Sequence, residues 1–331
     1  MINFTEEEFK NRTLMVAHVD LDGIMPFALN HFCGFPFTKE IPTNYEEKGE
    51  HHELSLMGEN DYVLYVDFTP DEEARKIITE KGIDCTIIDH HESQSESINE
   101  WKKTYPKVEF IYDSTKSGTL LYYEYLCSKN TKVKGNRVVE EICNLVSTYD
   151  LWQKDSPLWE KAQNLNRLMW KIANWAYKDE PLKLHEYFIN GQVWKMENAD
   201  SFFFNRFEQE KIDADIKAER EIFIEYTTNR QKIKTRKDSN GNYFSIIKLN
   251  KKVSIICSML LEKYRKLDYI ICINTYDSDN PRISIRSKEH INVLDFKNVK
   301  GHAQAGGMEN VTAQLCEDLW SGKIYELARA E

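Results

Sequence analysis

Residues 14–23 read LMVAHVDLDG, and this stretch is the main clue to both the fold and the function of the chain. Its first four residues form an apolar run of the kind that makes a buried strand. His18, Asp20 and Asp22 follow where that strand would end. Carboxylates and imidazoles packed this densely are costly to bury unless divalent cations hold them together. The stretch therefore predicts one half of a metal site at the end of a buried strand.

Three further apolar runs share the β-branched and aromatic character of a buried strand. Helical or polar segments separate them, and such alternation favours an α/β fold with a mainly parallel sheet and helices on both faces. The runs lie at residues 62–66, 86–88 and 108–112.

Titratable residues follow the first two of these runs. Asp67 comes directly after one, and Asp89, His90 and His91 come after the other. Because ligands of parallel sheets gather at the carboxyl ends of the strands, we expect these residues to join the first cluster at one edge. Asp67 is the natural bridge between two cations about 3.5–4 Å apart, with a hydroxide between them to attack phosphorus. Mixed carboxylate and imidazole ligation suits Mn²⁺ or a similar ion.

Helices are predicted after the sheet. Residues 137–149 carry an apolar stripe at helical spacing, which would present Asp150 at the helix end. An acidic residue is unfavourable there, so Asp150 is a candidate functional residue. The tryptophan-rich residues 152–175 are interpreted as core rather than as a base-stacking platform. Other helices are expected after a capping box at Thr5 and Glu8, at residues 118–128, and along the charged segment 201–228.

The C-terminal third of the chain predicts a smaller α/β unit. The sequence KDSNGN at residues 237–242 is typical of a turn, since Asn-Gly favours positive φ. The sequence GHAQAGG at residues 301–307 contains glycines that would let backbone N–H groups approach an anion closely. Strands are expected at residues 243–249, 269–273 and 282–286, with a helix at residues 253–263.

The composition indicates a folded protein with two domains. The chain has 331 residues, of which 41% are hydrophobic. The net charge of −10 argues against a protein that simply coats long nucleic acid. That charge is divided unevenly, with −15 on residues 1–231 and +5 on residues 232–331, so cations are expected in the first part and an anionic substrate in the second.

Cysteine usage and the N-terminal sequence bear on the compartment. The seven cysteines include no CxxC pair, which fits reduced thiols in a cytosol. The N-terminus lacks an apolar targeting segment, and no stretch approaches about 18 uninterrupted apolar residues. We therefore expect a soluble cytoplasmic protein that does not enter a membrane.

Five motifs stand in order along the chain. They are HVDLDG (18–23), YVDFTP (65–70), IDHHES (88–93), STYDLW (147–152) and GHAQAGG (301–307). Together they resemble the DHH phosphoesterases with a C-terminal DHHA1 domain, a superfamily that includes RecJ-like exonucleases and oligoribonucleases. The resemblance covers nearly the whole chain. The STYDLW motif and the modest size favour the oligoribonuclease branch.

The resemblance implies a division into three segments. A DHH catalytic domain that binds the metal would occupy residues 1–195. A helical connector would follow at residues 196–235, and a DHHA1 substrate-binding domain would occupy residues 236–331.

The resemblance also implies two Mn²⁺ ions, with Mg²⁺ or Co²⁺ as alternatives, that share one aspartate. His91 would face the substrate phosphate as a donor or acid, and Asp89 would orient His90. The first implied ligand set is His18, Asp20 and Asp67, and the second is Asp22, Asp67, His90 and Asp150. In the DHHA1 domain, the residues implied to grip the phosphate and base of the terminal nucleotide are Arg286, Ser287, His302, Gly306 and Gly307.

These features predict a Mn²⁺-dependent phosphodiesterase, an exonuclease that releases mononucleotides from short single-stranded RNA or DNA. Within enzymes, the alternative substrates are a cyclic dinucleotide of the cyclic-di-AMP type and phosphoadenosine phosphate. From another class, the alternative is a nucleotide-binding sensor without catalysis. The expected partner is short single-stranded nucleic acid or a dinucleotide. The direction of attack, the native metal and the oligomeric state, a homodimer included, stay open.

Overall fold

The computed structural model describes residues 12–35, 37–44, 49–173, 181–275, 281–308 and 311–329. The chain divides into two compact units, Met1–Ile212 and Asp213–Glu331. The division falls within the long helix α9 (Arg206–Thr228), inside the segment that the sequence predicts as a connector. The assignment of catalytic, connecting and substrate-binding roles to the segments 1–195, 196–235 and 236–331 stays a prediction. The short helix expected after Thr5 lies outside the described residues.

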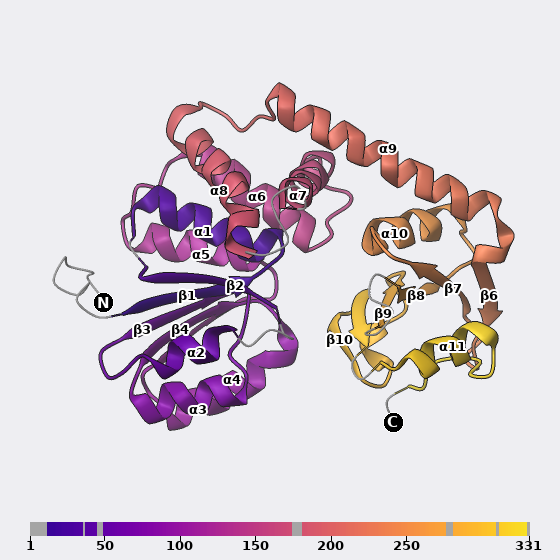
Figure 1. Cartoon of the computed structure of the whole chain (residues 1–331), viewed down its shortest axis with the longest axis horizontal. Coiled ribbons are helices and arrows are strands. Elements are labelled where there is room, and N and C mark those ends of the chain that lie inside the picture. Colours follow the sequence, from indigo (N-terminus) through magenta and orange to yellow (C-terminus); the bar gives the residue numbers. More distant parts are fainter. Residues whose placement is uncertain are drawn as a thin grey trace. The chain divides into compact units, whose positions relative to one another are not determined.

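The first unit is built on a five-stranded parallel sheet with the order β2-β1-β3-β4-β5 (Figure 1). The three central strands, β1, β3 and β4, are buried on both faces: Leu14 and Val16 of β1 pack into one core, while Met15 and Ala17 are buried on the other side. Strands of this kind read as continuous apolar runs, which is why the sequence predicts them; the edge strand β5 is predicted from its β-branched and aromatic residues. Their bounds are β1 (Thr13–His18), β2 (Lys39–Thr43), β3 (Tyr62–Val66), β4 (Asp84–Asp89) and β5 (Val108–Tyr112).

The strand that the sequence does not predict is β2, at the edge of the sheet. Its sequence KEIPT contains Pro42, a residue that sheets tolerate at edges because it has no N–H to donate. Lys39 is exposed and Glu40 is only half-buried, so no continuous apolar run marks the strand. Edge strands are for this reason harder to recognise from sequence than central ones.

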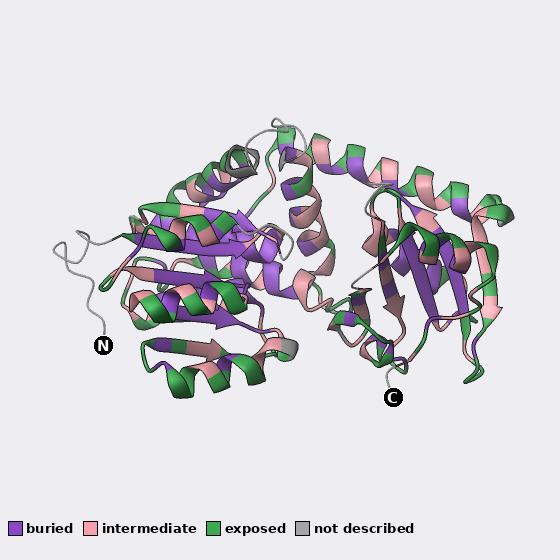
Figure 2. Ribbon diagram, turned by 60° about the horizontal axis from the view of Figure 1, so that its bottom comes forward, coloured by how far each residue is buried: buried purple, intermediate pink, exposed green. Residues whose placement is uncertain are grey.

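Helices cover both faces of the sheet, as the sequence predicts (Figure 1). The helices α1, α5, α6 and α8 lie on one face, and α2, α3 and α4 lie on the other. Figure 2 shows the buried strands between these partly exposed helices. No helix in the described part of the chain is both long and apolar enough to cross a membrane. The bounds are α1 (Leu21–Cys33), α2 (Gly49–Ser55), α3 (Glu72–Lys81), α4 (Glu92–Thr104), α5 (Gly118–Ser128), α6 (Arg137–Asp150), α7 (Trp159–Ala173) and α8 (Pro181–Asn198).

The second unit contains a six-stranded mixed sheet with the order β10-β11-β9-β8-β7-β6. Helix α10 and the end of α9 pack on one face, and α11 packs on the other. The predicted Asn-Gly turn joins β6 to β7, and GHAQAGG forms the hairpin of β10 and β11. The bounds are β6 (Ile233–Lys237), β7 (Tyr243–Leu249), α10 (Val253–Lys263), β8 (Tyr269–Asn274), β9 (Arg282–Ser287), β10 (Val299–His302), β11 (Ala305–Met308) and α11 (Ala313–Ser321).

Candidate metal centre

The sheet topology brings the titratable residues of the first unit together. Strands β1, β3 and β4 are neighbours and run in parallel, so their carboxyl ends meet at one edge. His18 ends β1, Asp67 follows β3, and Asp89 ends β4. Asp150, the last residue of α6, lies at the same edge. The convergence that the sequence predicts is thus present in the fold.

The ligand atoms form neighbouring groups in which all the atoms lie within 4.8 Å of one another. Every group consists of carboxylates and imidazoles, the donors that suit Mn²⁺ and ions of similar character. The groups are His18 with Asp20 and Asp67, Asp22 with His90 and Asp150, and Asp67 with Asp89, His90 and His91. The first two correspond to the ligand sets implied by the resemblance, except that Asp67 joins the second set through His90.

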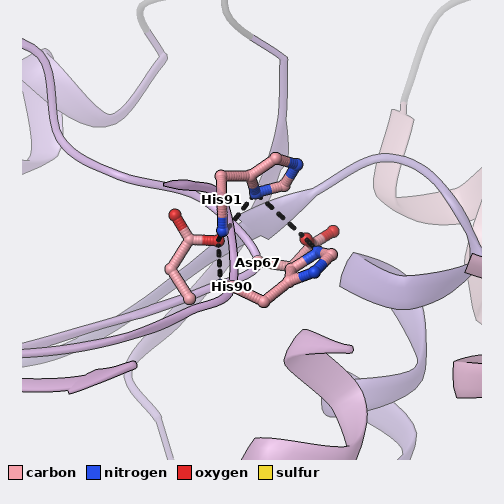
Figure 3. A group of neighbouring side chains, drawn as sticks. Asp67, His90 and His91 are labelled. Carbon is pink, nitrogen blue, oxygen red and sulfur yellow. Dashed lines mark hydrogen bonds and ion pairs between the residues drawn. The ribbon is translucent and has the colours of Figure 1, made fainter. Parts of the chain in front are cut away.

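Asp67 belongs to two of these groups. Its Oδ1 lies 3.2 Å from Nε2 of His90 and 3.8 Å from Nδ1 of His91 (Figure 3). Its Oδ2 lies 3.9 Å from Nδ1 of His18. The two oxygens of one carboxylate therefore face different groups, which is the arrangement a bridging ligand needs. Asp67 has a φ of 53°, a left-handed conformation that aspartate adopts at some cost and that often marks functional sites.

His90 and Asp150 form the buried side of the site. Nε2 of His90 lies 3.4 Å from Oδ2 of Asp150 and 3.7 Å from Oδ2 of Asp22. The Asp150 oxygen is buried and accepts no hydrogen bond from any described residue. Buried polar atoms are nearly always satisfied, so an acceptor left over among other ligand atoms fits a place for a cation.

The accumulated negative charge affects the protonation of two carboxyls. Burial, and then the charge of Asp22, raise the pKa of Asp67 well above its usual value. The same two causes, in the same order, raise the pKa of Asp150. Bound cations would neutralise this charge and favour the ionised carboxylates. The residues present therefore fit a divalent metal site in donor type, distance and electrostatics.

Asp20 combines two roles in the first group. It is the N-cap of α1, where its Oδ1 accepts a hydrogen bond of 3.1 Å from the N–H of Gly23. Its Oδ2 lies 2.9 Å from Nδ1 of His18. Burial alone would raise the pKa of Asp20, but the charge and hydrogen bond of His18 outweigh it and lower the pKa. Capping and ligation are thus compatible for this residue.

The side-chain contact of Asp89 is with His91 and not with His90, the residue that the sequence analysis expects Asp89 to orient. Its Oδ1 lies 2.8 Å from Nδ1 of His91 and accepts a hydrogen bond from the backbone N–H of His90. The imidazole that it orients is therefore that of His91, the N-cap residue of α4. Burial would lower the pKa of His91, but the hydrogen bond and charge of Asp89 outweigh it and raise the pKa to about 9.

Two residues of α5 that the sequence does not identify hold Asp22 in place. The backbone N–H groups of Gly118 and Thr119 donate to Oδ2 and Oδ1 of Asp22 at 2.6 and 2.9 Å. The hydroxyl of Thr119 also donates to the main-chain oxygen of Asp22 at 2.5 Å. A helix N-terminus stabilises a carboxylate through such N–H groups and through its dipole. The sequence does indicate a helix start here, because Ser117 is a typical capping residue. It does not indicate that the N–H groups after Ser117 bind Asp22, which is almost a hundred residues away.

Gly118 also sets the distance between α5 and Asp67. A Cβ at Gly118 would lie 2.6 Å from the Cβ of Asp67 and 3.0 Å from its Cα, closer than atoms can approach. Only glycine allows the helix to begin this near the bridging residue. The first turn of α5 therefore supports both Asp22 and Asp67.

The candidate residues of the second unit also lie together. Arg286 of β9 pairs with Ala305 of β11, and Gly306 pairs with Gly301 of β10. The N–H of Ser287 donates to the main-chain oxygen of Gln304 in the hairpin turn. The backbone of His302 ends β10, and Gly307 follows Gly306 in β11. The residues implied to form a substrate pocket thus occupy neighbouring strands.

These residues have structural partners of their own. The Arg286 guanidinium donates to Oγ of Ser254 at 2.7 Å and to the main-chain oxygen of Ile285 at 2.9 Å. The Ser287 hydroxyl donates to the main-chain oxygen of Ile291 at 2.7 Å. A Cβ at Gly306 would lie 2.5 Å from Cγ1 of Val299, so packing alone requires glycine there. Their role in binding a substrate stays a prediction.

Comparisons with known proteins bear on the fold. No family model and no curated protein matches the chain. A solved DHH domain, described as that of a member of a family of ribosomal proteins, matches with a TM-score of 0.62, at 15% identity, over 97% of this chain and 88% of that one.

Two RecJ structures match as well. Exonuclease RecJ bound to manganese matches with a TM-score of 0.50, at 13% identity, over 94% of this chain and 88% of that one. RecJ from Thermus thermophilus in complex with Mn²⁺ matches with a TM-score of 0.51, at 14% identity, over 98% of this chain and 54% of that one. The chain therefore has the fold of the DHH superfamily, which confirms at the level of fold the resemblance seen in its motifs.

Proposed function

We propose that this protein is a phosphodiesterase that depends on two divalent cations, with Mn²⁺ as the preferred ion. In this proposal it releases mononucleotides from an end of short single-stranded RNA or DNA. The observation that supports it most strongly is the buried edge where the two oxygens of Asp67 face two groups of carboxylates and imidazoles. The likeness in fold to RecJ bound to manganese supports the same chemistry.

The first group would consist of His18, Asp20 and Asp67, and the second of Asp22, Asp67, His90 and Asp150. Asp67 would belong to both, because its oxygens face opposite sides. When bound, divalent cations activate water as a nucleophile and neutralise negative charge on the phosphoryl oxygens. The protein fixes the ligands before any cation arrives, because Asp22 is held by α5 and Asp20 by the start of α1.

His91 would supply the proton for the departing oxygen of the substrate. Asp89 holds Nδ1 of His91 and raises the pKa of the ring, which favours the protonated form, in which Nε2–H is the donor. His90 is placed differently from His91, because Nε2 of His90 is directed at Asp67, Asp22 and Asp150. The two neighbouring histidines thus have different roles, one toward the cations and one toward the substrate.

Arg286 and the hairpin of β10 and β11 would bind the substrate away from the chemistry. The guanidinium is the side chain best suited to a phosphate, and the neighbouring N–H groups of a glycine-rich hairpin add donors. The mildly basic charge of residues 232–331 is consistent with an anionic ligand.

A substrate screen tests the proposal. Purified protein with Mn²⁺ is incubated with labelled RNA and DNA of two to five nucleotides, with either end blocked, and the products are sized. Cyclic-di-AMP and phosphoadenosine phosphate are tested in parallel, with Asp67→Asn as the inactive control. We expect mononucleotides from the short strands. If the protein hydrolyses only the cyclic dinucleotide or only phosphoadenosine phosphate, that compound is the substrate, and the proposed exonuclease activity is wrong. Binding without turnover of any substrate would favour the sensor and contradict the proposal.

A further inference from the structure

The turn after α6 carries an unusual residue two positions beyond Asp150. Trp152 has a φ of 54°, in the left-handed region. Its N–H donates to the main-chain oxygen of Tyr149, and the next N–H, of Gln153, donates to that of Thr148. This is the pattern in which a helix ends with a left-handed residue, a position that glycine usually occupies.

Placing tryptophan there opposes the intrinsic backbone preference. A bulky side chain in the left-handed region is a genuine outlier, and such conformations persist only where the surroundings demand them. Helix termination alone does not demand a tryptophan, because glycine would end α6 with less strain. The indole of Trp152 must therefore be explained by what it contacts.

The indole belongs to a group of three aromatic rings, which we name the aromatic cluster: Tyr149, Trp152 and Trp159. Trp152 meets Trp159 edge-on at 5.0 Å and Tyr149 at 5.6 Å between ring centroids. Tyr149 and Trp159 stack with an angle of 13° at 5.9 Å. All three residues are only half-buried, so Trp152 and Trp159 are less buried than the core that the sequence predicts for residues 152–175. An aromatic surface on this turn remains accessible to a ligand.

Two features indicate which ligand suits the aromatic cluster. Asp150, whose carboxylate belongs to the metal centre, is two residues from Trp152, so their Cα atoms are at most about 7 Å apart. The ammonium of Lys154 lies 5.6 Å from the centroid of the Trp152 ring, which adds positive charge beside the aromatic surface. A ligand with an aromatic part and an anionic part matches this combination.

We propose that the aromatic cluster is a stacking subsite for the nucleobase of the nucleotide whose phosphate lies at the metal centre. This inference rests on the proposed function. Stacking on indole and phenol rings tolerates every base, because every base has a π-face. The subsite would therefore bind nucleotides with little sequence preference, while Lys154 would favour their negative charge.

Substrates with and without a base distinguish two roles of Trp152: stacking on the base, and holding Asp150 in place. The first is a diribonucleotide with both bases, and the others carry an abasic ribose at one position or at both. We expect Trp152→Ala to raise KM for a substrate with the stacked base about ten-fold, and to leave KM for its abasic counterpart unchanged. Trp152→Phe should retain most of the wild-type KM, because it keeps a ring. Trp194→Ala, an exposed tryptophan on α8, is the matched control and should change neither value.

The variant Trp152→Gly guards against a merely structural explanation. Glycine favours the left-handed position, so this variant should unfold at a temperature no lower than Trp152→Ala while showing the same rise in KM. A loss of kcat that is equal for intact and abasic substrates in all variants would assign Trp152 to supporting Asp150 and overturn the subsite. An unchanged KM in Trp152→Ala and Trp152→Gly would overturn it as well.

A binding measurement keeps the subsite testable without turnover. In the presence of Mn²⁺, a 5′-mononucleotide and ribose 5-phosphate are each titrated while tryptophan fluorescence is followed. We expect the mononucleotide to bind more tightly than ribose 5-phosphate, with the difference lost in Trp152→Ala. Absence of turnover in the wild-type protein would contradict the proposed function, whereas equal affinity for both ligands would contradict the subsite.

Discussion

The two sets of candidate residues differ in how the protein satisfies their polar atoms. The candidate metal centre at the carboxyl end of the parallel sheet, which we call the metal edge, contains carboxylates that face one another. Oδ2 of Asp150 is buried there, with no hydrogen bond from the described residues. In the second unit, Arg286 and Ser287 donate to neighbouring oxygens of their own fold. The first set is unfavourable for a protein without cations, whereas the second is explained by structure alone.

This difference shows where function can be inferred from structure. A cluster that costs stability needs a reason outside the fold, and divalent cations supply one. A satisfied arginine needs no ligand to account for its position. The metal edge therefore supports the proposed chemistry, while the second unit needs an experiment to separate substrate binding from structure.

The largest effect is expected from Asp67→Asn. Asparagine keeps the shape and tolerates a positive φ, but it cannot serve both groups as a bridging carboxylate. Turnover of a short oligonucleotide with Mn²⁺ should fall by about 10³-fold or more, while the circular dichroism spectrum stays unchanged. Activity within a few-fold of wild type would show that Asp67 takes no part in catalysis.

The support from α5 is tested by Gly118→Ala. The added Cβ would press on Asp67, so the affinity for Mn²⁺ should fall by about 10–100-fold in a calorimetric titration. Gly191→Ala on α8 is the matched control, because nothing lies within 4 Å of its added Cβ, and it should bind Mn²⁺ like the wild type. Equal affinities in the two variants would show that the approach of α5 does not position the ligands.

The second unit is tested by Arg286→Ala. Loss of the guanidinium leaves Oγ of Ser254 and the oxygen of Ile285 without their donor, so the free energy of unfolding should fall by about 1–3 kcal/mol. If the guanidinium also binds substrate, KM should rise about ten-fold at an unchanged kcat. Arg282→Ala, exposed on the same strand, provides the comparison. A destabilised variant with an unaltered KM would restrict Arg286 to a structural role.

The smallest effect is expected for Asp150→Asn in protein stripped of metal. The raised pKa of Asp150 means that the folded state keeps a proton which the unfolded state releases above its pKa of 3.8. Stability from this group is therefore present below pH 3.8 and declines as pH rises through the folded pKa. Asparagine does not titrate, so the variant should be more stable than wild type by about 1 kcal/mol at neutral pH and lose this advantage near pH 4.

Denaturant unfolding at both pH values, with a chelator present, measures this difference. Addition of Mn²⁺ should reverse the order, because only the wild type gains the full stabilisation by the cation. A variant less stable than wild type without metal would show that Asp150 is satisfied by the fold itself.

Much of the first unit could be predicted from sequence, because strands buried on both faces read as apolar runs and their ends carry the charged residues. The runs before Asp67 and Asp89 show this directly. The support of Asp22 by Gly118 and Thr119 could not be predicted, since those hydrogen bonds join residues almost a hundred positions apart. The pairing of Asp89 with His91 could not be predicted either, because sequence spacing does not determine which of two adjacent histidines a neighbouring carboxylate contacts.

The C-terminal end of α6 shows a different limit. The apolar stripe correctly places Asp150 at the end of the helix. The same sequence gives no reason to expect Trp152 in a left-handed conformation, because bulky residues rarely adopt it. Its half-buried indole therefore emerges only from the structure.

We propose that carboxylates and imidazoles distant in sequence hold two cations at the carboxyl end of the parallel sheet. Anomalous diffraction at the manganese absorption edge, from crystals grown with Mn²⁺, tests it most directly. We expect two peaks, one on each side of Asp67: the first among His18 and Asp20, and the second among Asp22, His90 and Asp150. Crystals with no manganese peak at Asp67 would contradict it.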